Sequence, residues 1–150
     1  MREILFRAKR IDNGEWIEGY YGIKGKGTDI ENHYIMVPTF QSSIGNYDYM
    51  CYFTDVHIDP ETLCQYTGLK DKNGNRIWEN DIVSINTYSY MEPEEDYFGK
   101  VVYAEGYACW CIQQPDDESP VPLYECEGSY KTDRFVEGNV FDNPELSKGE

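Results

Sequence analysis

The segment from Gln65 to Ile85, QYTGLKDKNGNRIWENDIVSI, places two turns between apolar stretches. Residues 72–75 contain an Asn-Gly pair, which is typical of tight β-hairpins because both residues accept a positive φ. Residues 79–81 predict a second turn, in which Asn80 can adopt the left-handed conformation that usually requires glycine. The apolar run 82–85 then begins a strand that can be covered on both faces. This pattern predicts a β corner resembling the one by which small SH3-like barrels fold a sheet back on itself.

The same segment partly resembles a calcium-binding loop. Asp71, Asn73 and Asn75 match the first, third and fifth positions of an EF-hand loop. That loop also requires glycine at its sixth position and glutamate at its twelfth, where this sequence has Arg76 and Ile82. We therefore interpret the segment as a structural turn and not as a calcium site.

Short strands and turn signals alternate along the rest of the chain. Residues 3–23 form a predicted β-hairpin around Asp12-Asn13-Gly14, and residues 59–62 predict a short capped helical turn. Loops are predicted at 24–34, 41–50, 91–99 and 115–122, and a second capped turn is predicted at 142–146. Further strands are predicted at 34–40, 51–58, 63–69, 81–90, 123–130 and 135–142, with a hairpin at 100–114.

No segment has the apolar periodicity of a long helix, so the predicted fold class is mainly β. We expect twisted antiparallel sheets or a small SH3-like barrel, with an N-terminal β-hairpin and only short helical turns. The chain of 150 residues is long enough for one domain. Within it, we expect an N-terminal β segment at 1–60, a barrel-like segment at 61–146 and a disordered tail at 147–150.

The charge is strongly acidic and unevenly distributed. The net charge is −15; residues 1–26 carry six basic and four acidic residues (+2), and residues 27–150 carry seven and 24 (−17). Such a surface repels phosphates, which argues against direct binding of nucleic acid. The acidity either keeps the protein in solution or faces a basic partner, in the extreme case as a mimic of DNA.

The sequence favours a cytoplasmic location. It has no run of 18 apolar residues, and the N-terminus MREILFR lacks the apolar segment of a signal peptide. We expect no association with membranes. The cysteine count of five is odd and fits reduced thiols.

Three of these cysteines are candidate metal ligands. Cys109 and Cys111 flank Trp110 in an apolar strand, which places both sulfurs on one face and the indole on the other. With Cys126 they would supply three thiolates, and His33 or His57 would have to complete a zinc site. The spacing does not favour this, so we expect core packing and neither a metal nor a cofactor.

The sequence contains no recognisable catalytic pattern, and no catalytic residue is assigned. Neither histidine has a nucleophile or base at a recognisable spacing. The acidic stretches 92–96 and 116–118 are interpreted as solvated, although a pair of carboxylates acting in hydrolysis stays open. The tyrosines are interpreted as strand residues, with a peptide-binding groove as the alternative; the candidates are Tyr20, Tyr21, Tyr47, Tyr49, Tyr88, Tyr90 and Tyr107.

The segment 65–85 resembles the hallmark of the YopX family of phage and prophage proteins, in which Q-Y-T-G-L-x-D-x-x-G precedes an aromatic residue, Glu-Gly-Asp and Ile-Val. The likeness extends to REILFRAKRIDNGEWIEGYY at the N-terminus and VEGNVFDNPEL near the C-terminus. One departure is Asn80, where the family usually has glycine. The resemblance implies a β-rich fold with an SH3-like element, encoded by phages or prophages, usually of low-GC Gram-positive bacteria. It implies no established activity.

Together these observations predict an accessory protein of a phage or prophage, acting as a non-catalytic protein-interaction module. Its partner would be an unidentified host or phage protein. The alternatives are an acidic inhibitor or DNA mimic of a basic host enzyme, and a hydrolase. The exposed strand edges expected of such hairpins also predict homo-oligomers.

Overall fold

The structure is a computed structural model that describes residues 2–42, 49–91, 93–116, 119–123 and 131–148. The chain divides into two compact units, residues 1–65 and residues 66–150. Helical structure in the described residues is confined to three short 3-10 turns. None of the described helical segments is long and apolar enough to cross a membrane.

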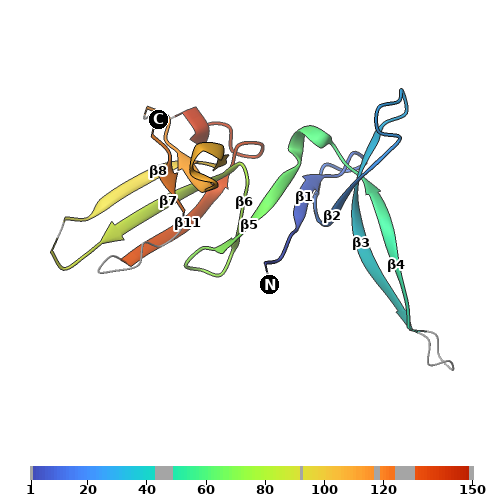
Figure 1. Cartoon of the computed structure of the whole chain (residues 1–150), viewed down its shortest axis with the longest axis horizontal. Coiled ribbons are helices and arrows are strands. Elements are labelled where there is room, and N and C mark those ends of the chain that lie inside the picture. Colours follow the sequence, from blue (N-terminus) through green and yellow to red (C-terminus); the bar gives the residue numbers. More distant parts are fainter. Residues whose placement is uncertain (1, 43–48, 92, 117–118, 124–130, 149–150) are drawn as a thin grey trace. The chain divides into compact units, whose positions relative to one another are not determined.

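The first unit is an antiparallel sheet with the strand order β4-β3-β2-β1-β5 (Figure 1). Pairing with β1 involves only the start of β5, through Phe6↔Gln65 and Arg7↔Cys64. The elements are β1 (Phe6–Lys9), β2 (Trp16–Lys24), β3 (Asn32–Ser42), β4 (Tyr49–His57), the 3-10 turn η1 (Pro60–Thr62) and β5 (Cys64–Lys70).

The turns of this unit follow the sequence signals. Gly14 has a φ of 71° in the β1–β2 turn, which confirms the predicted hairpin. Before η1, the Asp59 carboxylate accepts a hydrogen bond from the Glu61 backbone N–H at 3.0 Å, as expected of a cap followed by proline. A side chain at Gly19 would place its Cβ 2.5 Å from the Met36 carbonyl oxygen, so β2 and β3 approach closely there.

The core of the first unit is small. Ala8, Ile35 and Ile58 are buried to 1% exposure or less. They come from β1, β3 and the residue after β4, and partly buried side chains surround them: Phe6, Ile17, Tyr21, Val37 and Leu63. This core covers one face of β3 near Ile35 and leaves the opposite face open, a difference that matters for the candidate site.

The second unit is built on a five-stranded antiparallel sheet with the order β10-β9-β8-β7-β11. A β5–β6 hairpin, paired at Tyr66↔Trp78 and Lys70↔Arg76, precedes it. The elements are β6 (Arg76–Trp78), β7 (Asp81–Tyr88), β8 (Glu95–Ala104), η2 (Glu105–Tyr107), β9 (Cys109–Gln113), β10 (Val121–Pro122), β11 (Lys131–Asn139) and η3 (Leu146–Lys148).

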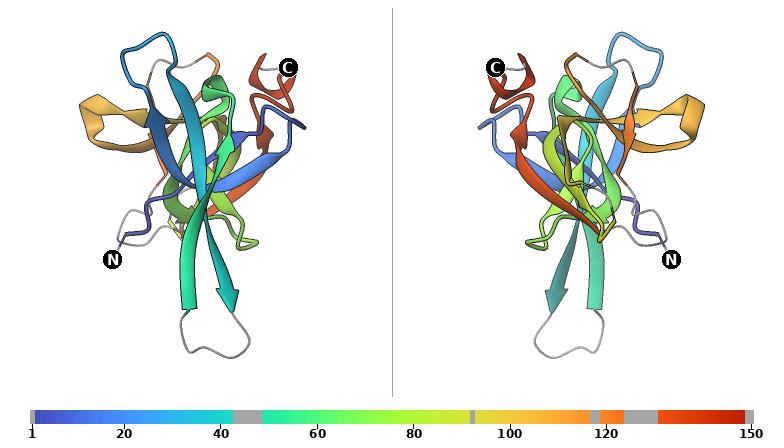
Figure 2. Two further views of the ribbon diagram at one scale, coloured as in Figure 1. Left: turned by 90° about the vertical axis from the view of Figure 1, so that its right-hand side faces the viewer. Right: turned by 90° about the vertical axis from the view of Figure 1, so that its left-hand side faces the viewer.

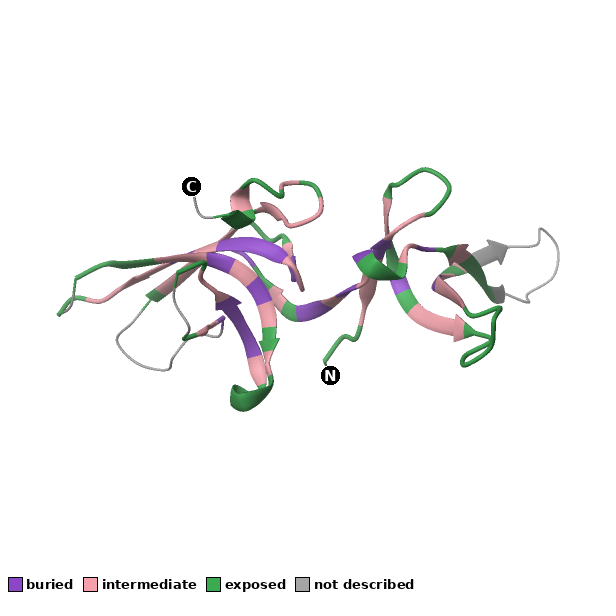
Figure 3. Cartoon of the chain, turned by 90° about the horizontal axis from the view of Figure 1, so that it is seen from above, coloured by how far each residue is buried: buried purple, intermediate pink, exposed green. Residues whose placement is uncertain are grey.

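The larger core belongs to this second unit. Figure 3 shows the buried residues in the central parts of its strands. The apolar cluster at its centre consists of Ile77, Val83, Ile85, Val101, Trp110, Ile112 and Leu123. Alternate residues of β7 and β9 therefore point into one apolar layer, which is the period-2 pattern predicted from the sequence.

The mainly β fold class with antiparallel sheets is confirmed, whereas the SH3-like barrel stays a prediction. Several loop boundaries were wrong. Residues 41–42 and 49–50 belong to β3 and β4, and β8 already begins at Glu95, because ladder pairing continues into these polar stretches. Ser147 and Lys148, expected in a disordered tail, belong to η3. Most of the strand predicted at 123–130 lies outside the described residues.

Candidate functional site

The Asp71 carboxylate is the centre of the first turn singled out in the sequence. Its Oδ1 accepts hydrogen bonds from the backbone N–H groups of Asn73 (2.9 Å) and Asn75 (2.8 Å). Its Oδ2 accepts from the Asn75 side-chain amide (3.1 Å) and from the Val136 backbone N–H (3.2 Å). Gly74 has a φ of 84°, which confirms the predicted turn. These donors occupy both oxygens, so the carboxylate joins the turn to β11 and is a structural centre.

Asp71 is largely buried, at 7% exposure. Burial by itself would raise the pKa of this carboxyl group. The hydrogen bonds from Asn75, Val136 and Asn73 outweigh burial and lower the pKa below its ordinary value. The ionised form is therefore the one that the fold stabilises.

The second turn places Asn80 in the left-handed region, with a φ of 66°. The prediction for Asn80 is thus confirmed. The Asn80 backbone N–H donates to the Val101 carbonyl at 3.0 Å, and its carbonyl accepts from the Val140 N–H at 3.1 Å. The buried Asp81 carboxylate accepts from the Trp78 N–H at 2.8 Å. The whole segment 65–85 therefore organises the second unit.

Cys109 and Cys111 lie on one face of β9, with their sulfur atoms 3.7 Å apart. Trp110 points to the other face and into the core, so the predicted alternation is confirmed. Burial and the neighbouring Cys109 raise the pKa of Cys111 to about 12. Cys126 lies outside the described residues. No group of three potential metal ligands comes together in the part of the chain that the structure describes.

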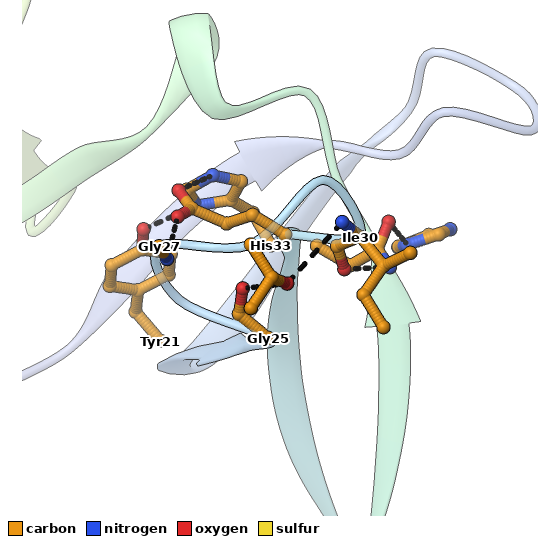
Figure 4. Close-up of polar contacts among 9 residues, drawn as sticks. Tyr21, Gly25, Gly27, Ile30 and His33 are labelled. Carbon is orange, nitrogen blue, oxygen red and sulfur yellow. Dashed lines mark hydrogen bonds and ion pairs between the residues drawn. The ribbon is translucent and has the colours of Figure 1, made fainter.

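His33 lies in a chain of polar contacts with Tyr21 and Glu31 (Figure 4). The Tyr21 hydroxyl is 2.6 Å from His33 Nδ1, and His33 Nε2 is 3.2 Å from Glu31 Oε1. Glu31 Oε2 accepts from the Gly27 N–H at 2.9 Å. Burial, followed by the charge of Glu31, raises the pKa of Tyr21, the opposite of what a phenolate nucleophile needs. We interpret the group as a brace for the turn between β2 and β3.

His57 has a separate environment. Its ring stacks on Tyr34 with centroids 4.5 Å apart, and its Nε2 lies 3.2 Å from the Asn32 side-chain oxygen. Both histidines thus make their contacts within the first unit.

A pocket with a volume of about 690 Å³ lies in the second unit. Its lining includes the apolar residues Ile82, Phe98 and Val140 and the polar residues Lys100, Gln113 and Asp116. Asp116 is the one acid among the described residues that line this pocket, and histidine is absent from that lining. The pair of carboxylates that the hydrolase hypothesis requires is thus missing from the described lining.

The acidity is concentrated in the second unit. Residues 1–65 contain six basic and ten acidic residues (−4), and residues 66–150 contain seven and 18 (−11). Several of these acids are used in local contacts. Asp96 accepts from the Asn86 amide, Glu137 accepts from the Ser84 hydroxyl, and Asp133 pairs with Lys72 at 2.7 Å.

The candidate tyrosines differ in exposure. Tyr20 (47%), Tyr90 (106%) and Tyr107 (60%) are exposed, while Tyr21 and Tyr88 are half-buried. Tyr47 lies outside the described residues, as does the side chain of Tyr49. Of the exposed tyrosines, Tyr20 has an exposed aromatic neighbour: its ring meets that of Phe53, 55% exposed, edge to face at 6.2 Å.

Phe53 belongs to a projecting hairpin that we call the β3–β4 arm, residues 37–42 and 49–54, and Tyr20 lies on β2 at the base of this arm. The ladder between β2 and β3 ends at Tyr20↔Met36, but the β3–β4 ladder continues from Val37↔Thr54 to Ser42↔Tyr49. Beyond Met36 the first unit therefore has only two strands among the residues described, and Figures 1 and 2 show this ribbon extending past β1 and β2.

The open face of the arm is aromatic. Residues directly opposite each other in antiparallel strands share a face. Tyr20 pairs with Met36 and Pro38 with Phe53, so these four side chains lie on the face opposite the buried Ile35. Asp55, opposite Met36, is on the same face and pairs with Lys24. The arm thus presents an apolar surface with one neutralised ion pair at its base.

Comparison with known proteins agrees with the family resemblance in the sequence. The family model described as YopX protein matches residues 5–148. The chain belongs to the YopX family. Among solved structures, this YopX-family chain is similar to protein EF1440 from Enterococcus faecalis, with 22% sequence identity and a TM-score of 0.54. The match covers 97% of this chain and 99% of that one, and it shows a shared fold. A comparison with curated proteins gives no match.

Sequence reasoning did not find the arm or the His33 contacts. One signal for the arm was available: residues 37–54 contain a single charged residue, Asp48, in a chain with 28 acids and 13 bases. Contacts such as Tyr21 to His33 depend on strand register, which the sequence alone did not supply.

Proposed function

We propose that this YopX-family chain is a non-catalytic protein-interaction module, an accessory protein of a phage or prophage that acts in the bacterial cytoplasm. The partner is a host or phage protein, and the β3–β4 arm is the contacting element. The observation that carries the proposal is the exposed aromatic pair formed by Phe53 on the arm and Tyr20 on β2 at its base.

Two physical arguments support this surface. Aromatic side chains dominate the central contacts of protein interfaces, because they bury a large apolar area at a small entropic cost. In a chain of net charge −15, the arm segment 37–54 carries only Asp48 as a charged residue. An arm that approaches a partner therefore meets little charge repulsion and leaves little charge to be desolvated.

The direct test is capture of partners from a lysate of the bacterium that carries the gene. The tagged wild type, Tyr20→Lys and Tyr107→Lys are compared by quantitative mass spectrometry. Tyr107 is the matched control, because it is also an exposed tyrosine, at 60%, but lies in η2. We expect Tyr20→Lys to reduce capture roughly tenfold or more, and Tyr107→Lys to leave it unchanged.

Equal capture by the wild type and Tyr20→Lys would remove the arm from the proposal. The acidic inhibitor would be favoured if Tyr20→Lys still captures the partner and if added salt abolishes this capture, since salt screens exposed charges. Turnover of a metabolite without any captured protein would favour the hydrolase.

A further inference from the structure

Strand β4 has an open edge. It is the outermost strand in the order β4-β3-β2-β1-β5, and among the described residues its ladder is formed with β3 alone, apart from the contact of His57 with Ile11 at its end. Residues 52–55 are exposed on both faces of the strand, which places this part of β4 outside the core. Such an edge presents unpaired backbone N–H and C=O groups to solvent.

The direction of these groups follows from two hydrogen bonds at the end of β4. The Ile58 N–H donates to the His33 carbonyl at 3.2 Å, so Ile58 points its backbone groups toward β3. The His57 carbonyl points the other way and accepts from the Ile11 N–H at 3.1 Å. Directions alternate along a strand, and the β3–β4 register has no shift. The backbone groups of Cys51, Phe53 and Asp55 therefore point outward.

The opposite edge of the arm is protected. By the same alternation, Pro38 directs its backbone nitrogen toward the side of β2, beyond the last β2–β3 pair at Tyr20↔Met36. Proline has no N–H, so another strand cannot complete a ladder there. Strand β4 carries no proline, no lysine and no bulge between Tyr49 and His57. The arm blocks one edge and leaves the other available.

We infer that the open edge of β4 pairs antiparallel with β4 of a second copy of this chain, around a two-fold axis at Phe53. The inference rests on the proposed function, for which it names a partner of the arm. In this register Cys51 pairs with Asp55 of the second copy, Phe53 with Phe53, and Asp55 with Cys51. Each of the three pairs exchanges two hydrogen bonds, so all outward groups from 51 to 55 are satisfied.

Two symmetric registers neighbour this one. The register centred on Tyr52 sets Phe53 opposite Cys51 and so loses the Phe53–Phe53 pair, and the register centred on Thr54 also forms fewer hydrogen bonds. The Thr54 register pairs Phe53 with Asp55 and requires Cys51 to pair with His57. The outward carbonyl of His57 is already occupied by Ile11. Only the two Phe53–Asp55 pairs would form, with four hydrogen bonds in place of six.

The side chains favour the same register. Centring on Phe53 brings two phenylalanines together, with Tyr20 of each copy behind them, in one continuous aromatic surface. With Phe53 at the centre, the Asp55 carboxylates of the two copies are separated by four residue positions along the paired strands. With Thr54 at the centre they are separated by only two, so the repulsion between the carboxylates is weaker in the Phe53 register. Each Asp55 is also neutralised by Lys24.

The test is sedimentation velocity of the full chain over a wide range of concentrations. We expect the wild type to shift reversibly from 17.5 kDa toward twice that mass. Phe53→Pro removes one outward N–H and no hydrogen bond to β3, so it should stay monomeric. Phe53→Lys should also stay monomeric, since it places two ammonium groups across the axis. Tyr107→Lys should dimerise like the wild type, and circular dichroism checks the fold of each variant.

A wild type that stays monomeric up to roughly millimolar concentration overturns the inference, as does a dimer that persists in both Phe53 variants. The register is tested by oxidation in a Cys51→Ser background. Phe53→Cys should form an intermolecular disulfide, because paired Cα atoms lie about 5.5 Å apart, and Thr54→Cys should form much less. More disulfide in Thr54→Cys than in Phe53→Cys would overturn the proposed register. If the wild type is monomeric and Tyr20→Lys still abolishes capture of a partner, the dimer is refuted and the proposed function stands.

Discussion

Replacing Asp71 with alanine should detach the turn at 71–75 from strand β11. The carboxylate accepts four hydrogen bonds, and three of the donors are backbone N–H groups, of Asn73, Asn75 and Val136. These backbone N–H groups are fixed by the fold, so in the variant they have no hydrogen-bond acceptor unless water enters the site.

The magnitude follows from these contacts. A partly buried donor that loses its partner costs about 1–3 kcal/mol, and the three are coupled, so we expect Asp71→Ala to lower the free energy of unfolding by about 4 kcal/mol. Asp71→Asn keeps one oxygen for Asn73 and Asn75 but turns an NH₂ group toward Val136, which should cost about 2 kcal/mol. At about 2–4 °C per kcal/mol, Tm should fall by about 8–16 °C and about 4–8 °C respectively.

Asp71 should also contribute to the pH dependence of stability. Its pKa in the folded chain lies below the ordinary 3.8. The ionised form therefore stabilises the fold fully at pH values above the unfolded pKa, and this contribution is lost as the pH falls through the lower, folded pKa. Both Asp71 variants should lack this part of the acid destabilisation.

The assay is thermal and urea unfolding of the full chain at pH 7 and at several pH values below 5. Asp116→Asn is the control, because Asp116 is exposed. The reasoning is refuted if Asp71→Ala unfolds within about 1 kcal/mol of the wild type at pH 7, or if the Asp71 variants keep the full wild-type loss of stability in acid.

Two further predictions concern the second unit. Asn80 has a φ of 66°, so Asn80→Val should cost about 2 kcal/mol in unfolding free energy while Asn80→Gly stays within about 1 kcal/mol; equal effects in urea unfolding would contradict the role given to the left-handed backbone. Because the pKa of the buried Cys111 is raised to about 12, iodoacetamide at pH 8 should modify this thiol only after unfolding, and rapid modification in the native protein, located by peptide mass spectrometry, would contradict that.

The turns were predictable because local chemistry decides them. Gly74 accepts a positive φ because it has no Cβ, and Asn80 because asparagine tolerates the left-handed region. The residues at 76 and 82 likewise argue locally against a calcium loop at Asp71. The Cys109–Trp110–Cys111 alternation was predictable for the same reason, since a strand has a fixed period of two.

The arm was not predictable in the same way. Residues 41–42 and 49–50 have the composition of a loop, yet they continue the β3–β4 ladder. Their strand conformation depends on pairing across the hairpin, a contact that a window of sequence does not contain. The meeting of Tyr20 with Phe53, and of Tyr21 with His33, depends on the same long-range register.

The central claim, that β4 offers its outer edge for pairing, is tested most directly by amide hydrogen exchange along this strand. In dilute protein, the Tyr52 and Thr54 amides, which point toward β3, should be protected, and the Phe53 and Asp55 amides should exchange rapidly. As the protein concentration rises, we expect Phe53 and Asp55 to become protected as well. Rapid exchange of these two amides at every concentration would contradict the claim.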